Sequence, residues 1–328
     1  MVVVAIIGAS SGLGLSFIRT AARDVDAMKK HHLVLISRSP QPQWQSKGFT
    51  VRQVDYASGA SLADALQGVH TVLSFVGQVL DTDPQLALIE AAREAGVTRF
   101  APSEYAGDGP YDAIDAYKHK AVVRKAAKDA GLQVTQFNCG LFLSLLATGT
   151  PKPVTIIGRE DGVESGEEEA LAGLRPWNFV LNMKGGTADL VRDGSAKMTL
   201  TDTRDIARFV LASLDLPEWP EKLGMSGCVS SYKEIVAYVE KVQGRKFLIR
   251  ENSIAELQAL ADSNPQARFY NQVRIAIDDG WALVNPDLNK AFPHIKPVTM
   301  EEFVDKWWMD VKLPAASWSE DKTFTVGQ

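Results

Sequence analysis

A tyrosine and a lysine that could transfer protons lie close together in the segment 115–131, which reads DAYKHKAVVRKAAKDAG and is predicted to be largely helical. A phenol and an ammonium group one full turn apart, in the pattern Y-x-x-x-K, can act together as an acid–base pair. The nearest pairing here is Tyr117 with Lys120, which is one residue shorter. Two interpretations stay open: an enzyme with different acid–base chemistry, or a binding protein that catalyses nothing.

The elements that would position these side chains alternate in the first half of the chain. Helical segments at 12–25, 61–68 and 83–96 lie between apolar runs, the last with Pro84 near its start and Gly96 at its end. Continuous apolar runs are typical of strands buried on both faces. The alternation predicts an α/β fold with a doubly wound, parallel Rossmann sheet. The expected strands are Val2–Gly8, His32–Arg38, Phe49–Asp55, His70–Gly77, Thr98–Ser103 and Leu132–Asn138.

The alternation breaks after about residue 150. The segment 147–177 is rich in glycine, proline and acidic residues and has no clear period, and the polar tail 319–328 is expected to be loosely held. Further on, 196–214 reads as a strand and a helix, and 230–244 as a helix with a capping box at Ser231. We therefore predict a cofactor-binding domain over 1–150, its sheet completed by segments near 196–230, and a smaller substrate-binding region over 151–328.

Glycines at the end of the first expected strand indicate a dinucleotide site. Gly8, Gly12 and Gly14 give the pattern G-x-x-x-G-x-G between an apolar run and a helix. Glycine allows the tight turn and the close approach of backbone N–H groups to a pyrophosphate at a helix N-terminus. The intervening residues Ser10, Ser11 and Leu13 are expected to contact the cofactor with them.

The residue at the end of the second strand distinguishes the two nicotinamide cofactors. An acid there would bind the ribose 2′-hydroxyl, whereas this chain has Arg38 beside Ser37 in LISRSP. A guanidinium suits a phosphate dianion, so NADP(H) is preferred over NAD(H). A solvated surface arginine is the alternative. Asp55 after the third strand is expected at the adenine edge, and Phe75, Val76 and Gly77 after the fourth at the adenosine ribose, although each could be an ordinary turn residue.

Two further segments resemble one known family. AAREAGVTRFAPSEYAGD (91–108) is similar to the A-x-x-A-G-V-x-R-F-x-P-S-E-[FY]-G segment of NmrA-like and isoflavone-reductase-like proteins, which are atypical short-chain dehydrogenases/reductases. KHKAVVRKAAKDAGLQVTQFNCGLF (118–142) is similar to that family's K-x-x-[IV]-R helix and following strand. The resemblance covers residues 1 to about 145 well and 185–210 more loosely. The chain departs from the family's G-x-x-G-x-x-G at Ser11, where Gly12 could compensate.

The resemblance implies a catalytic lysine in place of a tyrosine–lysine pair. Carried over by position, that lysine is Lys120, four residues before Arg124. At the first turn of a helix it would feel the positive end of the helix dipole, which with partial burial would lower its pKa. It could then relay a proton or bind the ribose hydroxyls. Tyr117 could be a proton donor, a pocket wall or an ordinary half-buried tyrosine.

Other candidates lie where the fifth and sixth strands end, beside the expected nicotinamide. The expected cofactor contacts are Ser103, Asn138, Cys139 and Gly140. Cys139 is expected to be a small buried residue and not a nucleophile. Several of these candidates have a structural alternative. Ser103 and Glu104 could cap a loop or pair with Arg99, and His119 could be a packed residue. Trp177, Phe179 and Met183 could belong to the core of the smaller region. The substrate candidates are Glu104, Tyr105, His119, Phe142, Trp177, Phe179 and Met183.

Composition excludes several other classes. A net charge of -5 without clustered Lys and Arg argues against a nucleic-acid partner. No run approaches a membrane span, the opening apolar run is too short for the core of a signal peptide and is expected to be a strand, and two cysteines favour a reducing, cytoplasmic location. The five histidines lack metal-ligand spacing, so no metal site is expected. We expect a monomer or homodimer acting on a small molecule.

Together these features predict an NADPH-dependent reductase of an apolar, aromatic or conjugated small molecule, with Lys120 assisting proton transfer. The resemblance also implies a second class, a regulator that binds NADP(H) and reports its redox state without turnover. A third alternative is a redox-neutral isomerase or dehydratase on the same fold. The sequence does not name the substrate or the stereochemistry.

Overall fold

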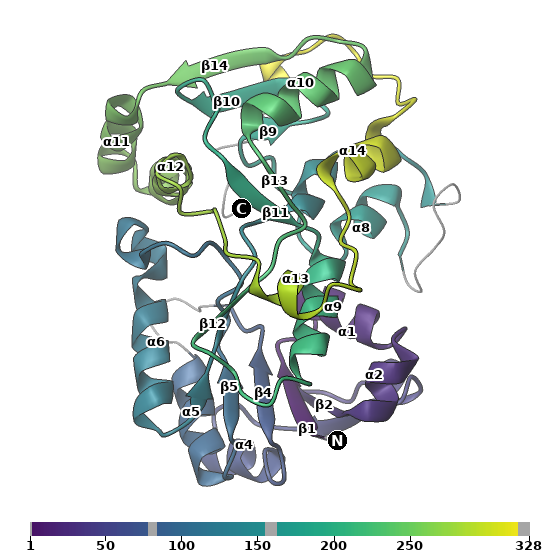
Figure 1. Ribbon diagram of the computed structural model, residues 1–328, viewed down its shortest axis with the longest axis vertical. Helices are drawn as coiled ribbons and strands as arrows, with labels where there is room; N and C mark the ends of the chain where they lie inside the picture. Colours follow the sequence, from purple (N-terminus) through teal and green to yellow (C-terminus); the bar gives the residue numbers. More distant parts are fainter. Residues whose placement is uncertain (1, 78–83, 155–162, 321–328) are drawn as a thin grey trace.

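A computed structural model describes residues 2–77, 84–154 and 163–320. A parallel sheet covered by helices on both faces forms the N-terminal half (Figure 1). A second region, built largely from residues beyond 163, lies across the end of this sheet where its strands finish. The expected α/β doubly wound fold is confirmed.

The main sheet has six strands in the order β3-β2-β1-β4-β5-β6, and every neighbouring pair is parallel. The order reverses beside β1, which is where ligands bind in such sheets. The expected runs all form strands, the last of them interrupted at Thr135. The bounds are β1 Val3–Ile7, β2 His32–Ser37, β3 Thr50–Gln53, β4 Thr71–Ser74, β5 Arg99–Ala101, β6 Gln133–Val134 and, beyond the interruption, β7 Gln136–Asn138.

Helices cover the two faces because their apolar residues recur at helical spacing. On one face Phe17 and Phe209 are fully buried against Ile6 of β1, and on the other Leu88 and Val123 are buried with Ile7. The first face carries α1 (Gly12–Ala21), α2 (Val25–Lys30) and α9 (Thr203–Ser213). The second carries α4 (Gly59–Ala65), α5 (Pro84–Glu94) and α6 (Lys118–Asp129), while α3 (Pro42–Gln45) follows β2.

The segments near 196–230 return to the end of the sheet. Strand β12 (Lys222–Gly224) pairs in parallel with β7, and β11 (Met198–Thr201) pairs with β8 (Leu141–Phe142) and with β13 (Cys228–Ser230). A separate small sheet joins β9, β10 and β14. The domain boundary at 150 stays a prediction. The bounds of this small sheet are β9 Leu181–Asn182, β10 Thr187–Val191 and β14 Leu248–Asn252.

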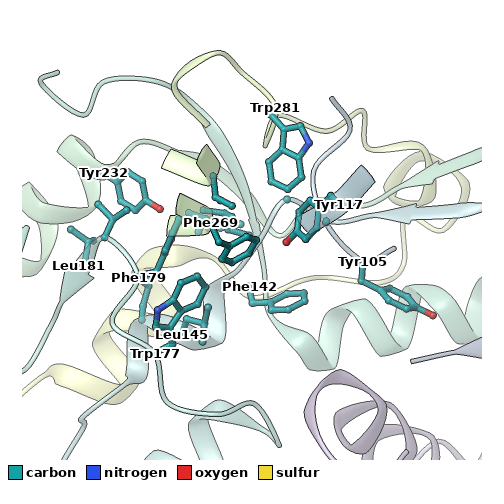
Figure 2. Close-up of a pocket in the computed structure, with 17 residues that line it drawn as sticks. Tyr105, Tyr117, Phe142, Leu145, Trp177, Phe179, Leu181, Tyr232, Phe269 and Trp281 are labelled. Carbon is teal, nitrogen blue, oxygen red and sulfur yellow. The ribbon is translucent and has the colours of Figure 1, made fainter. Parts of the chain in front are cut away.

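The helices of the second region surround an aromatic core. Trp307 and Trp308 are buried in it, and neighbouring aromatic side chains line a pocket that reaches the end of the main sheet (Figure 2). The predicted capping box at Ser231 is confirmed, and residues 321–328 of the expected loose tail lie outside the described residues. The helices of this region are α8 Gly166–Leu171, α10 Tyr232–Gln243, α11 Ile254–Ser263, α12 Pro265–Asp278, α13 Asp287–Ala291 and α14 Met300–Trp308. Along the chain, 3₁₀ turns form at Tyr111–Ala113, Asp115–Tyr117, Leu143–Ala147 and Trp318–Glu320.

Within the described ranges, no helix has the length and apolar character needed to cross a membrane. In the same part of the chain, no group of three His, Cys, Asp or Glu side chains is placed to hold a metal ion.

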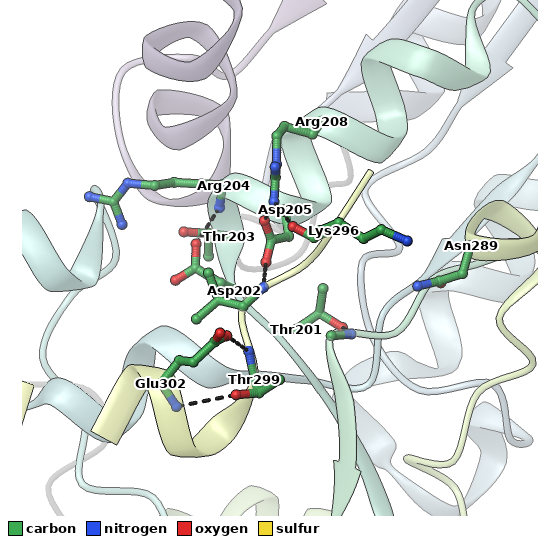
Figure 3. A network of polar contacts seen from close by, with 12 residues as sticks. Thr201, Asp202, Thr203, Arg204, Asp205, Arg208, Asn289, Lys296, Thr299 and Glu302 are labelled. Atoms are coloured by element: carbon green, nitrogen blue, oxygen red, sulfur yellow. Dashed lines mark hydrogen bonds and ion pairs between the residues drawn. The ribbon is translucent and has the colours of Figure 1, made fainter. Parts of the chain in front are cut away.

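A buried carboxylate ties helix α9 to the segment before α14 (Figure 3). Asp205 Oδ2 accepts the backbone N–H of Val298 at 2.7 Å, and Oδ1 accepts the guanidinium of Arg208, which also donates to the Lys296 carbonyl at 2.8 Å. The Asp205 side chain is only 1% exposed. This burial, with the neighbouring Asp202 carboxylate, raises the pKa of Asp205 to about 6.

The raised pKa predicts a pH-dependent contribution to stability. The folded protein should hold a proton on Asp205 between about pH 4 and 6 that the unfolded chain releases. Its free energy of unfolding should therefore fall across this window as pH rises, by up to about 3 kcal/mol relative to Asp205→Asn. Urea unfolding at several pH values measures this difference. The exposed control Asp64→Asn should track the wild type, and parallel curves for wild type and Asp205→Asn would contradict the assignment.

Candidate functional site

Backbone contacts at the end of β1 leave no space for side chains. Gly8 has φ +83°, and a Cβ there would lie 2.8 Å from the Phe75 carbonyl carbon at the end of β4. A Cβ on Gly14 would lie 2.3 Å from the Gly8 oxygen. The end of β1, the first turn of α1 and the end of β4 thus meet through bare backbone, which is the cradle that a dinucleotide pyrophosphate requires.

The other residues of the glycine-rich turn divide between surface and core. Ser10 and Ser11 are exposed, with Ser11 preceding the first turn of α1, while Leu13 is buried. Gly12 has φ +57°, and its N–H donates to the carbonyl of Gly173 at 2.8 Å. The segment after α8 therefore rests on the turn predicted to bind pyrophosphate.

The turn after β2 presents Arg38 to solvent beside a compact polar loop. Ser37 Oγ accepts the Ser39 N–H at 3.3 Å and the Gln41 amide at 3.2 Å. Arg38 lines a surface hollow with Asp55, so the structure brings these two predicted residues together. A guanidinium above a loop of hydroxyl and amide groups has the donors that a ribose 2′-phosphate requires.

The end of β4 is held by stacked aromatic rings. Phe75 packs on Phe17 with ring centroids 5.1 Å apart and stacks on Tyr105 at 4.9 Å. Val76 is half-buried and Gly77 is exposed, at the edge where the adenosine ribose was expected. Tyr105 is buried and its ring links this edge to the pocket beyond β5.

Lys120 and Tyr117 lie together at the start of α6. Tyr117 ends a 3₁₀ turn and occupies the position just before the helix, and Lys120 is the helix's third residue. Lys120 Nζ lies 5.0 Å from the Tyr117 ring centroid and donates to the Ser103 carbonyl at 2.6 Å. Burial raises the pKa of the Tyr117 hydroxyl to about 12. The predicted proton-transfer residues are thus neighbours, beside the end of β5.

Glu104 is held in a buried ion pair and does not line the pocket. Its side chain is 1% exposed, and Oε2 accepts Arg124 Nη1 at 2.6 Å and the Gln136 amide. The pairing partner considered from the sequence was Arg99, which instead binds the Gln133 side chain and carbonyls near residue 216. Glu104 therefore joins the loop after β5 to α6 and β7, because a buried carboxylate must be paired.

The end of β7 contributes mainly backbone. Asn138 is buried with its amide donating to the Gly107 carbonyl at 2.6 Å. Cys139 is fully buried, and burial raises the pKa of its thiol, as expected for a packed residue. Gly140 has φ +68°, lines the pocket, and would place a Cβ 2.2 Å from the Thr199 oxygen. Only glycine allows β7 to turn here against β11.

An apolar pocket of about 110 Å³ lies beyond the ends of β5 and β7 (Figure 2). Eight of its 17 lining residues are aromatic, and none of these described residues carries a charge. Rings pack on rings around it, as between Trp177 and Phe179 at 4.6 Å. The aromatic lining residues are Tyr105, Tyr117, Phe142, Trp177, Phe179, Tyr232, Phe269 and Trp281.

The pocket gathers most of the substrate candidates predicted from the sequence. Tyr105, Phe142, Trp177 and Phe179 line it. His119 is half-buried on α6 outside the lining, and Met183 is buried in the aromatic core.

The sequence analysis missed Tyr232, Phe269 and Trp281. One signal for Trp281 was available, because a Cβ on Gly107 or on Gly109 would lie within 2.6 Å of its atoms. Two glycines spaced by one residue, just after PSEY, marked the place where a large side chain approaches the backbone. The other two residues lie on helices whose packing no local pattern reveals.

Comparisons with known proteins agree with this architecture. Residues 2–304 match the NmrA-like family. Oxidoreductase BOA1 of Botryotinia fuckeliana (strain B05.10) is 29% identical over 261 residues, covering 75% of this chain and 78% of that protein. The isoflavone reductase homolog IRL of Zea mays is 25% identical over 285 residues, covering 80% and 83%.

Solved structures share the fold. The structure of AtPrR2 with NADP+ and (+)pinoresinol aligns over 93% of this chain and 98% of its own, with a TM-score of 0.71 and 18% identity. At this identity the likeness is one of fold. The family match over nearly the whole chain confirms the resemblance inferred from the PSEY segment and the lysine-containing helix: the chain belongs to the NmrA-like family.

Proposed function

We propose that this protein is an NADPH-dependent reductase of an apolar, aromatic or conjugated small molecule. The observation that carries the proposal is the uncharged aromatic pocket, whose lining residue Tyr105 stacks on Phe75, the residue that contacts Gly8 at the end of β1. Ligands of doubly wound sheets bind at this edge. The relatives named oxidoreductase and isoflavone reductase homolog support the reaction class.

The chain's residues fit NADP(H). Gly8 and Gly14 keep the backbone open for the pyrophosphate, and Arg38 with the loop after it supplies donors for the 2′-phosphate. Ser103, at the end of β5, brings the Lys120 ammonium to the nicotinamide end. When bound, NADPH supplies a hydride to an electrophilic carbon of the substrate.

Lys120 and Tyr117 supply the proton that hydride addition requires. An ammonium group has three N–H donors, so Lys120 can hold the Ser103 carbonyl and still approach the developing oxyanion or a ribose hydroxyl. Tyr117 remains protonated at neutral pH because its pKa is about 12, so its hydroxyl is a donor at the pocket wall. Lys120 is then reprotonated from solvent.

The test is oxidation of NADPH, followed through nicotinamide fluorescence, with a panel of aromatic enones, ethers and aldehydes. Tight NADPH binding with oxidation is the expected outcome. Tight binding without oxidation of any compound would instead favour the NADP(H)-sensing regulator, and product formation without change in NADPH would favour a redox-neutral isomerase or dehydratase.

Replacing Lys120 by alanine should abolish turnover while leaving the cofactor bound. We expect the turnover rate of Lys120→Ala to fall by roughly 10²–10⁴-fold, the usual contribution of a positioned acid or base. Its affinity for NADPH, titrated by fluorescence, should stay within about tenfold of the wild type. Lys118→Ala is the control, since Lys118 is exposed in an ion pair with Asp115 on the same turn. Retained turnover in Lys120→Ala would refute the role.

Replacing Arg38 by alanine should erase the preference for NADPH over NADH. The lost charge-assisted hydrogen bonds should weaken NADPH binding by roughly 10–100-fold and leave NADH binding nearly unchanged. Fluorescence titration with each cofactor measures both constants. The control Arg93→Ala removes an exposed arginine from α5, and an unchanged preference in Arg38→Ala would disprove the assignment.

A further inference from the structure

A buried glutamine occupies the apolar stripe of helix α5. Gln85 is only 3% exposed, and the residues three, four and seven positions after it are buried with it on the same face of the helix. Burying an amide costs free energy unless hydrogen bonds satisfy it, whereas a leucine would fill this position without that cost. The glutamine is therefore expected to have a specific partner. The stripe consists of Gln85, Leu88, Ile89 and Ala92.

The partner of Gln85 is a backbone N–H just beyond β5. Gln85 Oε1 accepts the N–H of Ser103 at 2.8 Å. The preceding residue, Pro102, has no N–H to continue the ladder of β5, and its carbonyl accepts the N–H of Glu104 at 2.8 Å in a tight turn. Ser103 lies in this turn, so the glutamine supplies the acceptor that a neighbouring strand would otherwise provide.

The carbonyl of the same serine holds the lysine of the proposed reaction. Lys120 Nζ donates to the Ser103 oxygen at 2.6 Å from the first turn of α6. The stem of a lysine is flexible, so its ammonium group stays in one place only if its acceptor is fixed. Because the N–H and the C=O belong to one residue, a shift of the turn that breaks the bond to Gln85 also moves the acceptor of Lys120.

We propose that Gln85 is a positioning residue for Lys120. It holds Ser103 so that the Ser103 carbonyl keeps the ammonium group at the end of β5, where the proton transfer is proposed to occur. Gln85 is not among the described residues that line the aromatic pocket, so it acts through Ser103 and not through the substrate. This inference rests on the proposed function, because it concerns the residue proposed to transfer the proton.

Replacing Gln85 by leucine should slow turnover without weakening cofactor binding. Leucine keeps the apolar stripe but removes the acceptor of the Ser103 N–H, so we expect turnover of a compound that the protein reduces to fall by roughly 10–50-fold. The dissociation constant for NADPH, titrated by fluorescence, should stay within about threefold of the wild type, since the cradle is unchanged. Gln85→Glu keeps an acceptor oxygen and places a negative charge in the first turn of α5, so it should retain roughly half of the turnover.

A double-mutant cycle separates positioning from a general loss of structure. If Gln85 acts through Lys120, Gln85→Leu should change the residual turnover of Lys120→Ala by less than about twofold. A fall of the same size in both backgrounds would overturn the inference. Gln258→Leu is the matched control, because it removes an exposed glutamine from α11 and should leave turnover unchanged.

Chemical labelling reads the position of Lys120 without any turnover. Limited acetylation by acetic anhydride, quantified by mass spectrometry, compares Lys120 with Lys118, whose side chain is 60% exposed on the same helix. The reagent requires the free amine, so an ammonium group held by a carbonyl reacts slowly. The ratio of Lys120 to Lys118 labelling should rise at least about threefold in Gln85→Leu and stay near the wild-type ratio in Gln85→Glu.

The labelling result also separates this inference from the proposed function. An unchanged ratio in Gln85→Leu would show that Gln85 does not hold the lysine and would overturn the inference. A raised ratio in a protein that oxidises no NADPH with any compound would support the positioning role while contradicting the reductase proposal.

Discussion

The site is built around one buried charge. Glu104 lies at the end of β5 with almost no exposure, and its carboxylate binds Arg124 of α6 and Gln136 of β7. Leaving such a carboxylate unpaired would cost several kcal/mol, so the three elements must approach in one arrangement. Lys120, one turn before Arg124, is thereby brought to the Ser103 carbonyl. The position of the proposed proton-transfer residues therefore depends on an ion pair whose carboxylate lies outside the pocket lining.

The pocket and the cofactor cradle have opposite physical characters. The cradle is bare backbone and exposed donors, as a charged dinucleotide requires, whereas the pocket is lined by aromatic and aliphatic side chains. The two are joined by Tyr105, which lines the pocket and stacks on Phe75 at the end of β4. In the proposed reaction, this apolar wall would exclude water from the carbon that accepts the hydride and so strengthen the few polar contacts there.

The sequence predicted the elements made of local signals and missed contacts that arise only in three dimensions. The strands and the capping box at Ser231 are local patterns and form as expected, apart from the interruption of the last strand at Thr135. The partner of Glu104 could not be read, because its distance from Arg124 depends on how α6 docks. Tyr232 and Phe269 were missed for the same reason, since their helices reach the pocket only after the second region folds over the sheet.

A bound pyrophosphate would compete with the Gly173 carbonyl for the backbone N–H of Gly12. The Gly173 carbonyl already accepts the N–H of Gly12, and a Cβ on Gly173 would lie 2.9 Å from the Gly12 oxygen. Any pyrophosphate that takes this N–H has to push the turn after α8 aside. Trp177 lies four residues after Gly173 and lines the aromatic pocket, so a displacement of this turn on cofactor binding would also shift part of the pocket wall.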